Sequence, residues 1–174
     1  MVRLEPLHPD HAVEMLEGLS APEAYRFIPD DPPADLDGLV RKYERQARGR
    51  SGDGAELWCN WIIRDAMTGV AMGYTQATIR DRSALIAYHV FPWFWRTGVG
   101  QAAVSMTLDQ LFARADVERV WALVDTRNAG SIALLIKLGF AIVDRHDDAD
   151  FFKGEPSDEL ELSLARAAWR PPVR

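Results

Sequence analysis

The sequence predicts a mixed α/β domain in which antiparallel hairpins come first and a parallel crossover follows. Residues 57–79 are rich in aromatic and β-branched side chains and are broken by a turn at residues 65–69, which is typical of two hairpin strands. From residue 85 onward the pattern alternates strand, helix, strand, helix, strand. This alternation implies at least one parallel strand pair joined by a right-handed crossover.

The elements of the first half follow from local patterns. Residues 1–4 suggest a short strand, and residues 10–19 and 36–47 repeat apolar side chains at helical spacing. Asp35 is a suitable cap for the second of these helices. After the hairpin, a third strand is expected at residues 85–90.

The second half predicts two further helices, at residues 99–115 and 129–138. Between them, residues 120–124 are continuously apolar, as expected of a strand that is covered on both faces. Strands are also expected at residues 140–144 and 159–164, the latter an edge or hairpin strand, with the acidic stretch 144–150 as a solvated loop or hairpin. No repeat or linker interrupts the chain, so one domain over residues 1–174 is expected.

Bulk properties exclude several classes of protein. The net charge of −6 argues against a nucleic-acid-binding protein, although it would suit a cationic substrate as well as simple solubility. Cys59 is the single cysteine and cannot form an internal disulfide, which favours a reducing compartment. The first residues lack the apolar run of a signal peptide, and no apolar stretch approaches the roughly 20 residues of a membrane span. We therefore expect a cytoplasmic protein without membrane or nucleic-acid partners.

A glycine-rich turn at residues 91–102 joins the third strand to the next helix. The first amides of a helix lack helical acceptors and lie at the positive end of the helix dipole. Gly98 and Gly100 would let a pyrophosphate approach them closely, although a plain turn would use the same glycines. A dinucleotide-binding fingerprint needs a third glycine where Ala103 stands, and the Gly-Lys-Ser/Thr of a P-loop is absent.

A second segment matches a spaced pattern at Asn128, Ser131, Lys137, Gly139 and Phe140. Together with the turn Trp95-Arg96-Thr97-Gly98-Val99-Gly100, it resembles the GNAT superfamily of N-acetyltransferases. That family has Gln/Arg-x-x-Gly-x-Gly/Ala at such a turn, followed by Asn-x-x-Ser and Lys-x-Gly-Phe. Trp95 departs from this pattern, but it is similar to what the subgroup of ribosomal-protein N-terminal acetyltransferases often has there.

The resemblance implies the GNAT fold, a mostly antiparallel central sheet with one parallel strand pair splayed around the coenzyme and flanked by helices. It implies transfer of the acetyl group from acetyl-CoA to a primary amine by direct attack on the thioester, with no metal. The acceptor would be a small-molecule amine or a protein N-terminus, and the protein a monomer or homodimer. A catalytically silent CoA-binding sensor, or a transferase of another acyl-CoA, is the alternative.

The resemblance also assigns the coenzyme site. Amides of the turn would hold the pyrophosphate, Asn128 would reach the pantetheine arm, and a freed N–H at Val90 or Phe91 would polarise the thioester carbonyl. Ser131 would bond the coenzyme sulfur and protonate the departing thiolate, unless its hydroxyl bonds only to backbone. The expected coenzyme-binding residues are Val90, Phe91, Trp95, Arg96, Thr97, Gly98, Val99, Gly100, Gln101, Ala102, Asn128 and Ser131.

The general base of many relatives, a strand glutamate, is replaced here by Leu85. Alternation along the strand places Leu85 and His89 on one face and Tyr88 on the other, where Tyr88 is expected in the core. His89, with an ordinary pKa of about 6.5, is therefore the second catalytic candidate beside Ser131. A histidine that only orients the substrate, or a carboxylate at Glu23 or near Asp158, is the alternative. Four tryptophans are expected in the core or on strand surfaces, or else around an aromatic-walled acceptor pocket: Trp58, Trp61, Trp93 and Trp95.

Overall fold

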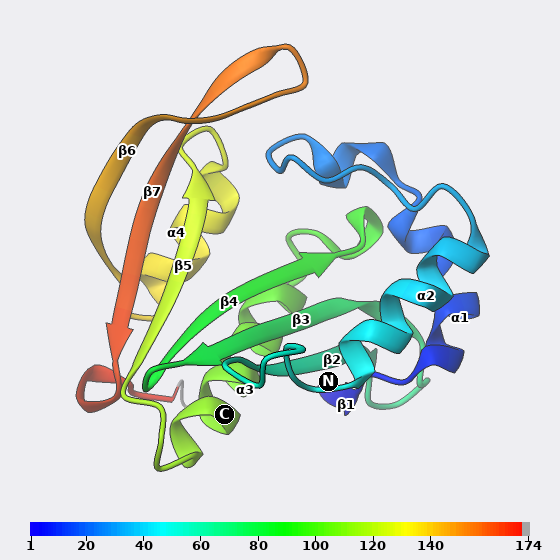
Figure 1. Cartoon of the computed structure of the whole chain (residues 1–174), viewed down its shortest axis with the longest axis horizontal. Helices are drawn as coiled ribbons and strands as arrows, with labels where there is room; N and C mark the ends of the chain where they lie inside the picture. The colour runs from blue at the N-terminus through cyan, green and yellow to red at the C-terminus, as the bar shows by residue number, and fades with distance from the viewer. Residues whose placement is uncertain (172–174) are drawn as a thin grey trace.

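The computed structural model describes residues 1–171, which form one seven-stranded sheet flanked by four α-helices (Figure 1). Residues 172–174 of the predicted domain lie outside the described part. The strands are β1 (Val2–Pro6), β2 (Leu57–Asp65), β3 (Ala71–Arg80), β4 (Ser83–Val90), β5 (Arg119–Asp125), β6 (Ala141–Phe152) and β7 (Glu155–Ala165). The helices are α1 (Ala12–Leu19), α2 (Leu36–Ala47), α3 (Val99–Ala113) and α4 (Ala129–Lys137).

The strand order is β1-β2-β3-β4-β5-β7-β6, and every neighbouring pair is antiparallel except β4 and β5. The parallel pairing covers only Ser83–Leu85 of β4 against Arg119–Trp121 of β5. Beyond these residues the two strands diverge, as the V between them in Figure 1 shows. The predicted mixed fold with one splayed parallel pair is confirmed.

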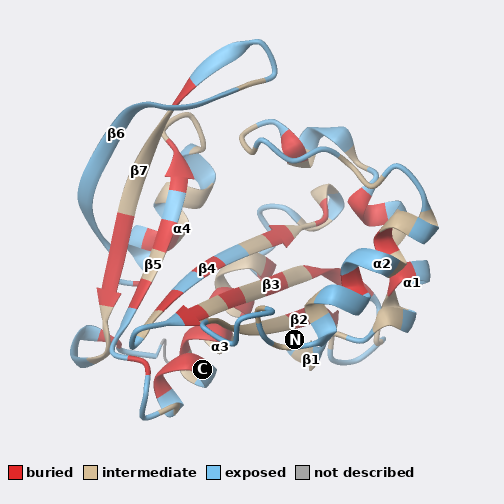
Figure 2. Ribbon diagram, in the orientation of Figure 1, coloured by how far each residue is buried: buried red, intermediate tan, exposed pale blue. Residues whose placement is uncertain are grey.

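The two faces of the sheet are covered differently (Figure 2). Helices α3 and α4 pack on one face across β3, β4, β5 and β7, and this larger core includes Val104, Leu108 and Leu135. Helices α1 and α2 cover the other face only over β2 and β3. Leu85 and Leu123 on this second face are therefore 44% and 46% exposed. The expectation that the strand at residues 120–124 is covered on both faces is wrong.

Local signals explain where the helices begin. Asp35 accepts a hydrogen bond from the Gly38 N–H at 2.6 Å and caps α2, as predicted. Asn128 caps α4 in the same way, through the N–H of Ser131 at 3.1 Å. No helix of residues 1–171 is both long and apolar enough to cross a membrane.

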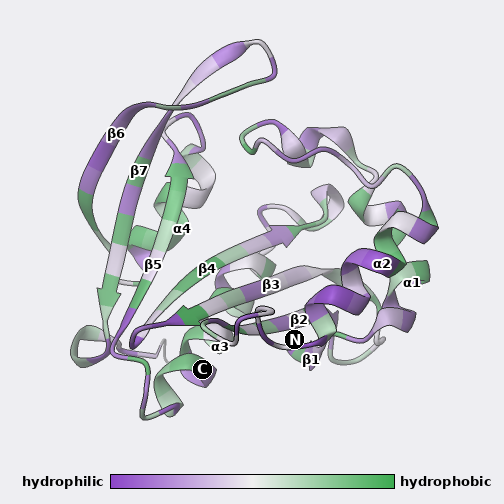
Figure 3. Ribbon diagram, viewed as in Figure 1, coloured by the Kyte–Doolittle hydropathy of each residue, from purple (hydrophilic) through white to green (hydrophobic). Residues whose placement is uncertain are grey.

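The β6–β7 hairpin confirms one of the two alternatives expected for each of its segments. The acidic stretch 144–150 belongs to β6 of this hairpin rather than to a loop, and residues 159–164 belong to its other strand, β7, which lies between β5 and β6 and not at the edge. Polar and charged residues dominate this hairpin (Figure 3), and Arg145 joins Asp147 and Asp158 with N–O distances of 2.7 Å. The pair with Asp147 lies within β6, and the pair with Asp158 crosses to β7, where it supports the exposed outer part of the hairpin.

Gly73 allows β3 to approach the end of β4 very closely. Its φ is +145°, a backbone region that side chains rarely adopt, and it lies opposite Val90. A Cβ built at this position would collide with the carbonyl oxygen of His89. The position of the last residues of β4 thus depends on a glycine in the neighbouring strand.

Replacing Gly73 with alanine is expected to lower the free energy of unfolding by at least about 2 kcal/mol, because it adds both backbone strain and a collision. Urea unfolding monitored by circular dichroism measures the loss. Gly52→Ala is the matched control, since a Cβ there meets no heavy atom within 4 Å and the φ is not positive; its change should stay within about 0.5 kcal/mol. Equal unfolding midpoints for the two variants would contradict this account of the strand contact.

Candidate active site

The turn before α3 presents a run of unsatisfied backbone amides. Arg96 and Gly98 both have left-handed backbone conformations, with φ of 63° and 86°. Among residues 1–171, the N–H groups of residues 96–101 have no hydrogen-bond acceptor, whereas the Ala102 N–H donates to the Gly98 carbonyl at 3.0 Å. The predicted anion-binding amides are therefore available except that of Ala102, which belongs to the first helical hydrogen bond. Such a concave run of N–H groups at a helix start suits a diphosphate.

The side chain of Trp95 fastens this turn to the end of β4. Its Nε1 donates to the Val90 carbonyl at 2.7 Å, while the indole remains 45% exposed. The Thr97 hydroxyl donates to the Phe94 carbonyl at 2.6 Å within the same turn. These side chains thus shape the turn. The Trp95 main-chain N–H donates to the Pro92 carbonyl at 3.0 Å, so the Thr97 N–H and the exposed indole are what remains for a ligand.

Of the two backbone N–H groups proposed to polarise the thioester carbonyl, only one has no hydrogen-bond acceptor within residues 1–171. The Phe91 N–H donates to the Met72 carbonyl of β3 at 2.9 Å, so the assignment of this role to Phe91 is wrong. Successive N–H groups of a strand point to opposite sides. The Val90 N–H therefore points away from β3, toward the side where β5 has diverged from β4.

Ser131 and Tyr88 meet across this divergence. The Tyr88 hydroxyl lies 2.6 Å from the Ser131 Oγ, which joins β4 to the first turn of α4. Burial raises the pKa of Tyr88 to about 12, so the hydroxyl remains protonated at neutral pH. Tyr88 lies on the face opposite His89, as predicted. In addition to packing in the core, its hydroxyl contacts the Ser131 side chain. The alternative in which Ser131 bonds only to backbone is wrong.

His89 is more deeply enclosed than a general base would require. It is 6% exposed, its ring stacks on Tyr74 at 5.5 Å, and Tyr25 and Phe91 pack against it at 5.2 and 6.3 Å. The Nε2 atom has no hydrogen-bond partner among the described residues. Burial, aided by the positive charge of Lys42, lowers the pKa of His89 to about 4. The expected pKa of about 6.5 is therefore wrong, and this histidine is neutral at pH 7.

The carboxylates near the end of β5 are occupied by structural contacts. Asp125 is 4% exposed and receives hydrogen bonds from Arg127 and from the Ser157 hydroxyl, at 2.5 and 2.7 Å to Oδ2. The Arg127 hydrogen bonds outweigh desolvation and lower the pKa of Asp125 to about 2. Asp158, an alternative base, accepts from Arg145 at 2.7 Å and from the Asp148 N–H at 2.9 Å. These pairs fix the base of the hairpin.

Lys153 at the tip of the β6–β7 hairpin reaches the loop between α1 and α2. Its Nζ donates to the carbonyls of Ile28 and Asp30 at 2.9 and 3.0 Å and lies 3.4 Å from the Asp31 carboxylate. One ammonium group thus ties together two segments on the side of the sheet that α3 and α4 leave open. The sequence offered no signal for this contact, because its partners are more than a hundred residues apart.

Comparisons with known proteins show the family and the fold. A family model described as an acetyltransferase (GNAT) domain matches residues 2–141. The uncharacterized N-acetyltransferase YoaA of Bacillus subtilis (strain 168) is 32% identical over 69 residues, a stretch that covers 40% of this chain and 39% of YoaA. The match therefore spans well under half of that relative.

Solved structures share the fold at low sequence identity. Spermidine N-acetyltransferase from Vibrio cholerae, in complex with CoA and spermine, is 16% identical with a TM-score of 0.82 over 96% of each chain. A GNAT-family acetyltransferase from Bacillus anthracis is 13% identical with a TM-score of 0.82 over 95% of each chain. These identities support the fold alone, and similarity to the ribosomal-protein subgroup stays a prediction. Since the family model matches most of the sequence, the chain belongs to the GNAT acetyltransferase family.

Proposed function

We propose that this protein is an acetyl-CoA-dependent N-acetyltransferase that acts on a small-molecule primary amine. The observation that supports it most is the run of six unsatisfied amides at residues 96–101, beside strands that diverge. Family membership supports acetyl transfer, and the spermine in the Vibrio cholerae structure supports an amine acceptor. A protein N-terminus is the second class of acceptor. With Cys59 as the lone cysteine, we assign the protein to the cytoplasm.

In this proposal the turn before α3 binds the coenzyme through backbone N–H groups. Bound acetyl-CoA would supply the thioester whose acetyl group is transferred. The amides of residues 96–101 would bind its diphosphate, with Gly98 and Gly100 leaving the approach open, and Asn128 would contact the pantetheine arm. The exposed side chains of Trp95 and Arg96 lie at the same turn and would complete the coenzyme site together with Gln101, whereas Val99, whose side chain is buried, and Thr97 would contribute their N–H groups.

Two groups of the chain would serve the chemical step. The Val90 N–H would donate to the thioester oxygen as negative charge develops there, a kind of contact that is worth about 3–4 kcal/mol in related sites. The Ser131 hydroxyl would donate a proton to the departing sulfur, and the Tyr88 hydroxyl would donate to Ser131 as its proton leaves. Both donors are uncharged at neutral pH, so neither needs a separate activation step.

His89 is better suited to positioning than to proton abstraction. With a pKa of about 4 and a ring covered by Tyr25 and Tyr74, it stays neutral over the range in which amines lose their proton. Leu85 offers no carboxylate in its place. We infer that the ammonium form of the acceptor loses its proton to water on the open face of β4, so the rate should rise toward the pKa of the amine itself.

Calorimetry with coenzyme fragments tests whether the protein binds the diphosphate of the coenzyme. Coenzyme A is expected to bind at least 100-fold more tightly than pantetheine, which lacks the diphosphate, because several charge-assisted hydrogen bonds are lost. Free thiol released from acetyl-CoA in the presence of an amine panel then tests transfer. Equal affinities for the two ligands would contradict the site, and tight binding without thiol release from any amine would indicate a sensor instead.

Tyr88→Phe is expected to lower kcat about tenfold while the KM for acetyl-CoA changes less than twofold, because the aromatic packing remains and only the hydroxyl behind Ser131 is lost. Ser131→Ala should lower kcat further. If Tyr88 acts through Ser131, adding Tyr88→Phe to Ser131→Ala should cost almost nothing more. Fully multiplicative losses in the double variant would show that the tyrosine acts on its own or only through stability.

Because His89 is buried in its neutral form, the free energy of unfolding is expected to decrease at acidic pH. The folded-state pKa of about 4 lies below the unfolded value of about 6.5, so the unfolded chain binds more protons in this window and stability falls as the pH falls. Between pH 7.5 and about pH 5, the free energy of unfolding should fall by about 2 kcal/mol, which urea unfolding measures. His89→Phe should remove most of it. A variant with the same pH dependence as the parent would mean that His89 is accessible to protons in the folded state.

A further inference from the structure

Lys153 occupies a turn position that usually takes a smaller residue. Phe152 pairs with Glu155 across the hairpin, so the turn consists of Lys153 and Gly154, and both have positive φ, 54° and 84°. Two-residue turns of this kind favour asparagine, aspartate or glycine, because other side chains strain a left-handed backbone. A lysine here strains the backbone more than asparagine would, so the turn alone does not account for it.

The Lys153 ammonium has an acceptor near it for each of its three N–H groups. It donates to the carbonyls of Ile28 and Asp30 at 2.9 and 3.0 Å, and the Asp31 carboxylate lies 3.4 Å away. A charged donor forms a stronger hydrogen bond than a neutral one. Two of these acceptors are backbone atoms, so the contact fixes the path of the loop as well as one of its side chains.

The turn that carries Lys153 is itself attached to the end of β5. The Arg127 guanidinium lies 2.5 Å from the Glu155 carboxylate and 2.5 Å from the buried carboxylate of Asp125. The Phe152 ring also contacts two cations, with the Arg127 Cζ 5.7 Å and the Lys153 Nζ 5.5 Å from its centre. The lysine therefore extends from a position that is fixed relative to the sheet.

The loop that Lys153 contacts has few other polar contacts. Among residues 1–171, the segment 28–34 has two more: the Ile28 N–H donates to the Tyr25 carbonyl at 3.3 Å, and Asp30 lies 4.0 Å from the Lys42 ammonium. Both distances are at the long end for contacts of their kind. Lys153 thus makes the shortest polar contacts of this segment.

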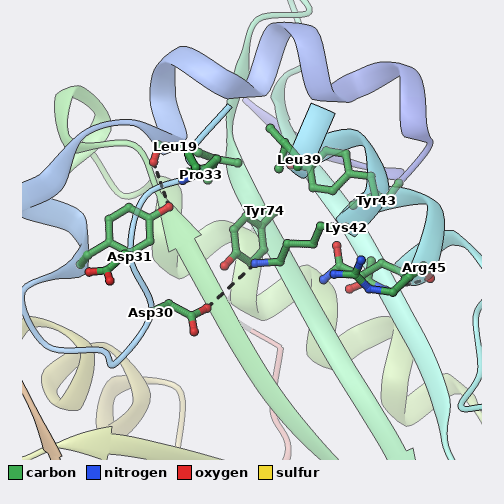
Figure 4. A pocket seen from close by; sticks show the side chains of 15 residues that line it. Leu19, Asp30, Asp31, Pro33, Leu39, Lys42, Tyr43, Arg45 and Tyr74 are labelled. Carbon is green, nitrogen blue, oxygen red and sulfur yellow. Dashed lines mark hydrogen bonds and ion pairs between the residues drawn. The ribbon is translucent and has the colours of Figure 1, made fainter. Parts of the chain in front are cut away.

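This loop forms one wall of a cavity beside β4. The cavity has a volume of about 420 Å³ and is bounded by the loop, α2 and the strands β2 and β3 (Figure 4). Asp30 and Asp31 of the loop line it together with Tyr25, whose ring packs on His89 of β4 at 5.2 Å. The loop therefore lies next to the residue that precedes Val90.

The walls of this cavity carry charges of both signs and contain no tryptophan among the described residues. Lys42 and Arg45 of α2 line it together with the loop carboxylates. Of the tryptophans predicted for an aromatic-walled pocket, Trp61 belongs to the main core, and Trp93 and Trp95 are exposed elsewhere. Because its charged residues come from both the loop and α2, the position of the loop determines which groups a ligand meets.

We propose that Lys153 is a positioning residue for the acceptor: it holds the loop at residues 26–31 beside the open face of β4, where the loop forms one side of the acceptor site. This proposal rests on the proposed N-acetyltransferase function and assigns a residue to its acceptor binding. Lys153 contacts the loop and not the reacting atoms. Loss of its ammonium therefore weakens acceptor binding and leaves coenzyme binding, at the turn before α3, intact.

Lys153→Met keeps an unbranched side chain and removes the ammonium. The KM for the acceptor is expected to rise at least about tenfold, because the loop must then be ordered on binding, while kcat and the Kd for coenzyme A change less than about twofold. Spermine, octylamine and phenethylamine serve as acceptors, and kinetics are measured with the one that releases thiol fastest. Lys153→Arg keeps charged donors for the same carbonyls and should return the KM to within about threefold of the parent value.

Arg82→Met is the matched control. Asp81 and Arg82 form another two-residue turn with positive φ, 48° and 64°, at the start of β4, and Arg82 pairs with Glu118. The variant removes the same charge from an equivalent turn at the opposite end of β4, so the acceptor KM should stay within about twofold of the parent value. An unchanged acceptor KM in Lys153→Met would overturn the proposal. A parallel loss of acceptor affinity, coenzyme affinity and kcat would also overturn it, because it would indicate a general loss of structure.

Nitrogen-15 relaxation without any substrate separates this proposal from the proposed function. The order parameters of the backbone amides at residues 26–31, all but Pro29, should be near 0.85 in the parent and in Arg82→Met and fall below about 0.6 in Lys153→Met. Equal order parameters in all three proteins would overturn the proposal. A more mobile loop with an unchanged acceptor KM would overturn the acceptor role and leave the N-acetyltransferase function standing. If the parent releases thiol with no amine, the proposed function and the acceptor role both fail, and relaxation alone decides whether Lys153 holds the loop.

Discussion

The site depends on a short parallel pairing that stops after three residue pairs. Because β4 and β5 separate beyond Leu85 and Trp121, the backbone groups at the end of β4 lose the neighbour that a continuous sheet would give them. Such groups are costly when they are buried without partners. Here one of them, the Val90 carbonyl, accepts from Trp95, while the N–H of the same residue is left facing the divergence. The interruption of the sheet thus leaves an unpaired backbone donor at the candidate site.

The two sides of the divergence are connected by side chains instead of by backbone. On the face covered by α3 and α4, Tyr88 reaches Ser131 at the start of α4. On the other face, Lys153 connects the β6–β7 hairpin to the loop before α2. Between these contacts, the helices leave one face of β4 and β5 uncovered. The divergence is therefore accessible from this face of the sheet, which is the arrangement that the proposed direct transfer needs.

Local patterns in the sequence were sufficient for the elements and for the glycine-rich turn. Asp35 and Asn128 mark helix starts, and the alternation along β4 correctly separates Leu85 from Tyr88. These local patterns were insufficient wherever the role of a residue depends on a partner that is distant in the sequence. Tyr88 meets Ser131 across 43 residues, and the burial that lowers the pKa of His89 depends on the rings of Tyr25 and Tyr74 from two other segments. The Phe91 amide is likewise occupied by a carbonyl from another strand.

The position of Lys153 in the chain determines how far substitutions near the hairpin tip affect the rest of the domain. The family model ends at residue 141, whereas the lysine lies beyond it, on a hairpin with little core of its own. The turn before α3 lies within the matched part, whereas β7 supplies Leu162 and Leu164 to the main core, so only the outer part of the hairpin is independent of that core. Substitutions near the exposed tip can therefore change the contact between Lys153 and the loop before α2 at little risk to the core that β7 shares with α3 and α4.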